Sequence, residues 1–363
     1  MKEMKDLLES HLLKINDEPE EDTEDKRNNT KIKTYIIESN IDNPKKIKTL
    51  PENSLLKETN DNNLYQLNFN QNIGSGQIFL DISDKRYWIL HSIGESNKIQ
   101  KYIQKLVTSN ESHLDYSWFS SNFLEEKCAI GTGEGFNIKY KNSFLDEQND
   151  EMVKRSLKSF TMLFWGTQPS EVISGLKENS TLASGVSLSR IKQLVKTDDG
   201  FVKENIGREG KFTLWKGDSI DSHLWAVEDI KSKYSDLISI FENEYRIQYK
   251  PTNSGYNIQG TYSRIIFNKK IQNMDFFLKR FLSGNDPFRI FGIPQKISET
   301  YYKIAAVDLH TYDKFNMEIT PDFIRIYLYK NSCGNVITRL MTNLQQFYDS
   351  QVEIRGMDNE KLL

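Results

Sequence analysis

The stretch from Tyr301 to Tyr348 reads YYKIAAVDLHTYDKFNMEITPDFIRIYLYKNSCGNVITRLMTNLQQFY. Its apolar and β-branched runs at 304–307 and 323–329 predict two strands, since such residues favour a pleated, half-buried backbone. A short polar loop at 330–334 then leads into an amphipathic helix at 335–348. The stretch also gathers more chemically usable side chains than any other part of the chain.

The same order of strand, polar loop and helix occurs three more times. The segments 86–93, 156–165 and 211–215 each read as a strand, and each is followed by a loop and an apolar periodicity typical of a helix. Units of this kind place helices against strands. The sequence therefore predicts an α+β fold, with mixed β-sheets flanked by helices.

The chain has 363 residues and 37% hydrophobic content, enough for a sizeable core in one or two domains. The spacing of the leucines in residues 1–15 predicts an N-terminal helix. Residues 1–30 hold five basic and ten acidic residues, which predicts an acidic, disordered linker after this helix. We expect an α+β domain at 31–250. Turn-forming residues at 250–255 mark a boundary, after which 251–363 forms a second α+β domain or continues the first.

The two cysteines, Cys128 and Cys333, exclude a disulfide framework and a cysteine-rich zinc site. Reduced thiols indicate a cytoplasmic protein. No apolar run approaches the roughly 18–20 residues that a membrane helix needs, and no signal peptide is present. A thiolate at the start of a helix is a candidate nucleophile with His310 as its base, but single buried cysteines are commoner.

The triplet Asp308-Leu-His310 places two metal-ligating side chains on one face of a strand, because strand side chains repeat every two residues. With Glu318, and with Asp313 as a further ligand, it suggests the catalytic site of a metal-dependent phosphoesterase or nuclease. Two observations weaken this hypothesis. No histidine follows His310, and Thr320 stands where a nuclease of the PD-(D/E)xK type has its lysine.

The start of the helix at 335 is a candidate anion site, since free N–H groups and the helix dipole favour negative charge. The residues expected to bind the anion are Arg325, Asn335, Arg339 and Asn343. The alternative is structural, with Arg339 forming an ion pair that ties the helix to the sheet. Its candidate partners are Asp308, Glu318 and Asp322.

The net charge of −3 argues against a protein that binds nucleic acid over its whole surface. Residues 261–340, however, hold twelve basic and seven acidic residues, which leaves room for a local basic face. We interpret the protein as a recognition component of a bacterial multi-subunit system, in a setting such as phage defence. It would bind a protein partner or a nucleic acid. No motif identifies a metal, a cofactor or an oligomeric state.

Overall fold

The computed structural model describes residues 1–17, 31–51, 54–69, 76–145 and 157–363. They form a mixed α+β fold, as the sequence predicts, and all four expected strand–loop–helix units are present. The acidic linker predicted before residue 31 lies almost entirely outside the described residues. The chain divides into two compact units that alternate along the sequence. Unit 1 comprises Met1–Ser117, Lys127–Glu134 and Arg190–Lys233, and unit 2 comprises Trp118–Glu126, Gly135–Ser189 and Tyr234–Leu363.

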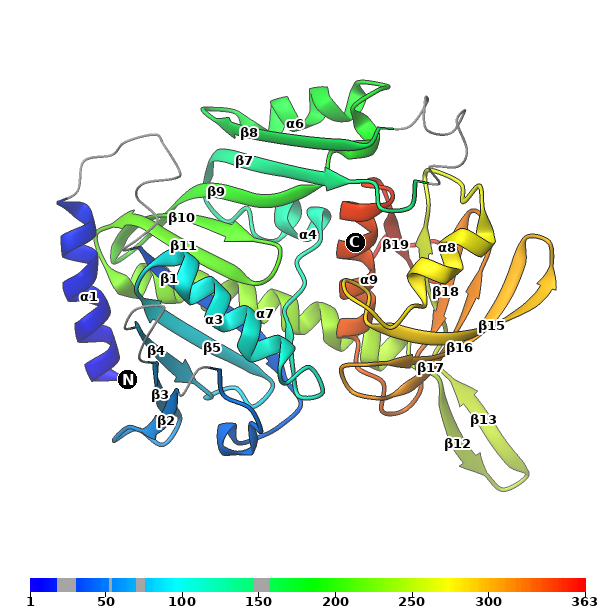
Figure 1. Ribbon diagram of the computed structural model, residues 1–363, viewed down its shortest axis with the longest axis horizontal. Helices are drawn as coiled ribbons and strands as arrows, with labels where there is room; N and C mark the ends of the chain where they lie inside the picture. Colours follow the sequence, from blue (N-terminus) through cyan, green and yellow to red (C-terminus); the bar gives the residue numbers. More distant parts are fainter. Residues whose placement is uncertain (18–30, 52–53, 70–75, 146–156) are drawn as a thin grey trace. The chain divides into compact units, whose positions relative to one another are not determined.

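The helices and strands of the chain are shown in Figure 1. The helices are α1 (Lys2–Asn16), α3 (Ser96–Thr108), α4 (Ser121–Glu126), α6 (Pro169–Glu178), α7 (Ile220–Glu244), α8 (Met274–Phe281) and α9 (Asn335–Phe347), with 3-10 turns at Pro44–Lys46 and Ala183–Gly185. The first strands are β1 (Ile32–Ser39), β2 (Leu55–Glu58), β3 (Leu64–Phe69), β4 (Gly76–Asp81), β5 (Tyr87–Ile93), β6 (Leu114–Tyr116), β7 (Thr132–Lys141), β8 (Ser159–Trp165), β9 (Leu188–Thr197), β10 (Gly200–Gly207) and β11 (Lys211–Gly217). The remaining strands are β12 (Gln248–Thr252), β13 (Gly255–Gln259), β14 (Ser263–Ile266), β15 (Ile290–Ser298), β16 (Tyr301–Asp308), β17 (Lys314–Ile319), β18 (Phe323–Tyr327) and β19 (Glu353–Arg355).

Unit 1 is built on a sheet in which neighbouring strands follow the order β2-β3-β4-β5-β1-β11-β10-β9. The predicted N-terminal helix is present as α1, and its apolar stripe packs in one core with Ile32 of β1 and Leu214 of β11. Helix α3 packs in a second core with Tyr35 of β1 and Leu90 of β5. Ile32 and Tyr35 point to opposite sides of β1, so the two helices cover opposite faces of this sheet.

Unit 2 contains a six-stranded sheet in the order β15-β16-β17-β18-β14-β19, and its registered pairs are antiparallel. Six aromatic rings pack edge to face or stacked in its core: Phe144, Phe267, Phe277, Phe281, Phe288 and Tyr348. The stretch 301–348 holds three strands rather than the two that its sequence predicts, because 314–319 also pairs. The edge strand β15 was not among the strands predicted from the sequence.

Strands β12 and β13 form a separate two-stranded hairpin in unit 2, which Figure 1 shows projecting as a ribbon beside β17 and β18. This hairpin lies where the sequence suggested a domain boundary, which remains a prediction. Among the described residues, no helix has the length and apolar character needed to cross a membrane.

A buried polar chain connects four side chains inside unit 1. The Thr34 hydroxyl lies 3.0 Å from Nδ1 of His91 and 2.9 Å from Nε2 of His223. Nδ1 of His223 lies 2.8 Å from Oε2 of Glu204. A hydroxyl has one proton, so Thr34 donates to one imidazole and accepts from the other. Burial, and then the charge of His223, lower the pKa of His91 to about 3.

This pKa predicts a loss of stability in acid. Between the ordinary histidine pKa of about 6.5 and the folded value of about 3, the unfolded chain binds the extra proton, so stability falls as the pH drops. The slope for one such group approaches about 1.4 kcal/mol per pH unit. Urea unfolding of His91→Asn, which keeps a polar atom near Thr34, should show a flatter pH dependence than the wild type.

A matched variant, His113→Asn, removes a half-exposed histidine of the same unit. The difference in slope between the two variants isolates the contribution of His91. Equal slopes for wild type, His91→Asn and His113→Asn between pH 7 and pH 5 would contradict the assignment.

Candidate functional site

Three polar side chains are buried where β16 ends: Asp308, His310 and Arg339. Arg339 of α9 is 0% exposed and forms an ion pair with Asp308, the last residue of β16. Its Nε donates to the carbonyl oxygen of Phe288 at 3.0 Å. The structural interpretation of Arg339, in which it ties the helix to the sheet, is therefore confirmed, and Asp308 is the partner.

The start of α9 is occupied by groups of the chain itself. The backbone N–H of Gly334 donates to Oε1 of Glu242 at 2.8 Å, so a carboxylate already sits where an anion would bind. Asn335 accepts a hydrogen bond from the Tyr234 hydroxyl. Asn343 donates to two backbone carbonyl oxygens. These side chains are buried and hold the helix in place, whereas Arg325, the fourth residue of the expected anion site, lies on β18.

The three residues of the expected metal site are not brought together. Glu318 lies opposite Lys303, five residues along β16 from Asp308, which corresponds to about 16 Å. His310 is buried in the turn after β16, and its backbone N–H donates to Asp308 at 3.0 Å. Within the described ranges, no group of three His, Cys, Asp or Glu residues could hold a metal ion. Cys333 is half-buried, and its sulfur accepts the N–H of Asn335.

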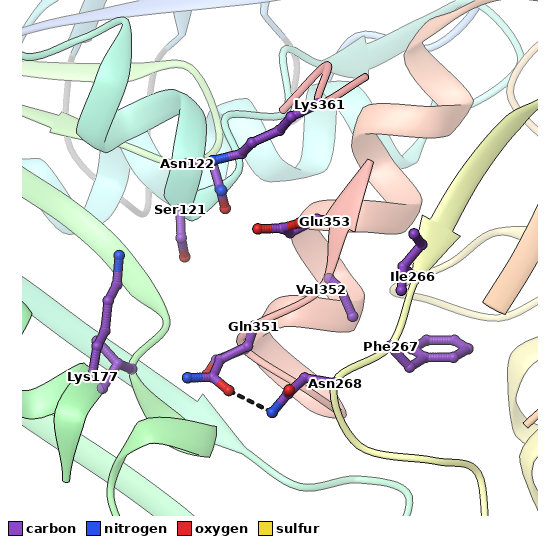
Figure 2. Close-up of a pocket in the computed structure, with 12 residues that line it drawn as sticks. Ser121, Asn122, Lys177, Ile266, Phe267, Asn268, Gln351, Val352, Glu353 and Lys361 are labelled. Atoms are coloured by element: carbon purple, nitrogen blue, oxygen red, sulfur yellow. Dashed lines mark hydrogen bonds between the residues drawn. The ribbon is translucent and has the colours of Figure 1, made fainter. Parts of the chain in front are cut away.

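A polar hollow of about 430 Å³ lies elsewhere in unit 2 (Figure 2). Figure 2 shows the hydrogen bond across its floor between Asn268 and Gln351, 2.6 Å long. Its two lysines are engaged with carboxylates, Lys177 with Glu125 at 2.6 Å and Lys361 with Glu126 at 3.0 Å. Both lysines of this hollow are therefore already paired with carboxylates that lie outside its lining.

The six-stranded sheet has one covered and one open face. Along β16, β17 and β18 every second side chain is buried, and the residues between them are half-exposed or exposed. On the covered side, the Tyr302 hydroxyl donates to Asp275 of α8 at 3.0 Å, so this helix lies against that face. We call the opposite side, which carries Lys303, Arg325 and Tyr327, the open face.

The strand register aligns the side chains of the open face in rows that run across the strands. One row runs Ile293, Ala305, Asn316 and Tyr327 across four strands. A second, which we call the basic row, crosses all six strands and consists of Gln295, Lys303, Glu318, Arg325, Arg264 and Arg355. The basic row has four cationic side chains and one carboxylate. Between the rows lies a hollow of about 570 Å³, and Tyr329 also lines it.

Aromatic rings and guanidinium groups alternate on this face. The guanidinium of Arg325 lies 5.0 Å from the ring centre of Tyr262 and 4.9 Å from that of Phe323. Tyr262 in turn packs on Tyr327 with ring centres 5.7 Å apart. Burial, and then the charge of Glu318, raise the pKa of Tyr327 to about 12, so its hydroxyl keeps its proton and donates to Glu318 at 3.1 Å.

Fold and site together define an α+β protein whose concentrated, accessible chemistry is an open sheet face of cations and aromatic rings. The chain belongs to the MJECL33-like protein family, whose model matches residues 1–363. The protein MJECL33 of Methanocaldococcus jannaschii is 30% identical over 384 aligned residues, which cover 96% of this chain and 88% of the relative. The similarity thus extends over both units.

Sequence reasoning concentrated on the carboxylates and missed the open face. The signal was present as a two-residue alternation in three neighbouring segments. Lys303 and Ala305, then Asn316 and Glu318, each stand between apolar residues that are buried. Reading all three strands as half-buried would have shown a polar and basic face opposite the core.

The buried ion pair generates a stability prediction. Arg339→Met leaves the carboxylate of Asp308 buried without its cation, and such a loss typically costs about 3–5 kcal/mol. The matched variant Arg325→Met breaks a pair that is partly open to solvent and should cost at most about 1 kcal/mol. Urea unfolding of both variants measures the difference. An Arg339→Met protein as stable as Arg325→Met would contradict the structural assignment of Arg339.

Proposed function

We propose that the protein is a recognition component that binds nucleic acid on the open face of the six-stranded sheet. The basic row is the observation that carries this proposal. Its cations, Lys303, Arg325, Arg264 and Arg355, stand in register on neighbouring strands and outnumber the single carboxylate of the row, Glu318. Clustered Lys and Arg on one face are the electrostatic footprint of a nucleic-acid-binding surface.

The length of the row suits a phosphate backbone. Strands lie about 4.8 Å apart, so the four spacings from β16 to β19 extend over about 19 Å. Phosphates along one strand of B-DNA are about 3.4 Å apart along the axis, so several of them fit within this length. Two of the cations also have carboxylate partners, Arg325 with Glu318 and Arg355 with Glu353, which hold their side chains in place on the face.

The aromatic rings beside the row supply the second element of such a surface. Tyr262, Phe323 and Tyr327 lie among the guanidinium groups, and rings of this kind accept stacked bases in many nucleic-acid-binding sheets. An open sheet face also gives access to an extended ligand, unlike the enclosed pocket that small molecules prefer. Recognition is favoured over hydrolysis because Glu318 lies about 16 Å along the sheet from Asp308. A cytoplasmic location, a protein partner and a phage-defence setting remain predictions from the sequence.

Fluorescence anisotropy with a labelled oligonucleotide of about 16 nucleotides tests the proposal. The wild type should bind at low ionic strength, and its affinity should fall linearly with salt on logarithmic axes, because bound phosphates release counterions. Lys303→Gln should weaken binding several-fold and reduce the salt slope by about 0.7, the value for one phosphate contact to a single strand.

Lys279→Gln is the matched control, since Lys279 is exposed on α8, the helix that lies against the covered face. It should bind as the wild type does. Absence of oligonucleotide binding by the wild type at low salt, or equal losses in Lys303→Gln and Lys279→Gln, would refute the proposed interface.

A further inference from the structure

The hairpin of β12 and β13 has one apolar and one polar face. Its register places Tyr249 opposite Ile258 and Pro251 opposite Tyr256. Directly opposite residues project to the same side, and residues two apart share that side. These four side chains therefore form one face, which we call the hairpin apolar face. Gln248, Lys250, Asn257 and Gln259 form the other.

The hairpin apolar face is open to solvent. Tyr249 is 60% exposed, Tyr256 is 72% exposed and Ile258 is 65% exposed. An isolated two-stranded hairpin is at best marginally stable in water, and contiguous exposed apolar side chains of this size mark interaction sites. The arrangement therefore indicates a ligand that covers the rings.

The hairpin apolar face is joined to the open face at both ends of the hairpin. Before β12, the N–H of Ile247 donates to the carbonyl oxygen of Leu328 at 2.7 Å. The hydroxyl oxygen of the next residue, Tyr329, accepts a hydrogen bond of 2.7 Å from Nδ2 of Asn316 on the open face. Burial, and then the neighbouring Tyr249, raise the pKa of Tyr329. After β13 the chain runs directly into Tyr262, which packs on Tyr327 and Arg325.

The charge of the hairpin and of the open face indicates which kind of ligand covers these rings. Residues 246–261 contain Arg246 and Lys250 and no Asp or Glu. The hairpin therefore brings no negative charge to the rings, and it continues an open face with an excess of cations. An anionic ligand with flat apolar groups complements both features. Unpaired bases on a phosphate backbone have this composition, whereas bases inside a duplex are already stacked on one another.

We propose that the hairpin is a clamp for single-stranded nucleic acid, in which Tyr249 and Tyr256 stack on unpaired bases while the backbone follows the basic row. This inference rests on the proposed function and specifies its substrate class. Stacking on an aromatic side chain changes affinity by about 5-fold to 150-fold per base. The tyrosines carry no charge in this role, so they contribute affinity without salt dependence.

The test measures the affinity of the full chain for a labelled single-stranded oligonucleotide of about 16 nucleotides by fluorescence anisotropy. It compares two double variants and one single variant with the wild type. Tyr249→Ala/Tyr256→Ala should bind at least about 5-fold more weakly than the wild type with an unchanged salt slope. Tyr249→Phe/Tyr256→Phe keeps both rings and should bind as the wild type does. Tyr312→Ala removes a tyrosine that is also 60% exposed, in the turn between β16 and β17, and should have no effect.

The outcomes separate the two proposals. If the wild type binds and the double alanine variant binds equally well, the clamp is refuted while the open face stands. The clamp is also refuted if an unlabelled duplex of the same length competes as well as the single strand, or if Tyr312→Ala loses as much affinity as the double variant. If the wild type binds no oligonucleotide at low salt, both proposals fall together. Because the replaced tyrosines are exposed, circular dichroism of each variant should match the wild type.

Discussion

The two-residue period of the strands is the constraint on which unit 2 depends. It directs apolar side chains of β16, β17 and β18 into an aromatic core and leaves the alternate residues on the other side. Antiparallel register then aligns these residues from strand to strand. Cations on four of the six strands thus fall into one row, and the row defines a surface that no single segment of the sequence contains. Shifting one strand by a single residue would exchange its buried and open sets and destroy both the core and the face.

The charged residues of unit 2 have one of two roles, depending on how far their side chains are exposed to solvent. Asp308 and Arg339 are enclosed, and a charge in that position is tolerated because it has an opposite charge and hydrogen bonds beside it. This buried ion pair is inaccessible to a ligand, and it attaches α9 to the sheet. Arg325 and Glu318 form a similar pair, yet water reaches them, so their energetic contribution to folding is small and their side chains are accessible to a ligand. Residue type alone does not distinguish the two pairs, whereas burial does.

The sequence predicted the α+β class and the four strand–loop–helix units because these follow from local periodicity. It did not separate the two roles of the charged residues, since burial arises from contacts between distant segments. The edge strand β15 was not predicted from the sequence, and it contains Pro294. An edge strand tolerates a proline that the centre of a sheet would not, and the position of a strand in a sheet is not a local property. The turn-forming residues at 250–255, which suggested a domain boundary, lie in the hairpin that carries Tyr249 and Tyr256.

The account predicts a continuous ligand path from the hairpin apolar face to the basic row. Ultraviolet cross-linking of a single-stranded oligonucleotide to the full chain, followed by mass spectrometry of the cross-linked peptides, measures this path directly. Adducts should concentrate in residues 246–262 and 301–329, with the tyrosines of the hairpin and of β18 among them. Adducts confined to other segments, or none above the level seen with a denatured chain, would contradict the assignment of nucleic-acid binding to this surface.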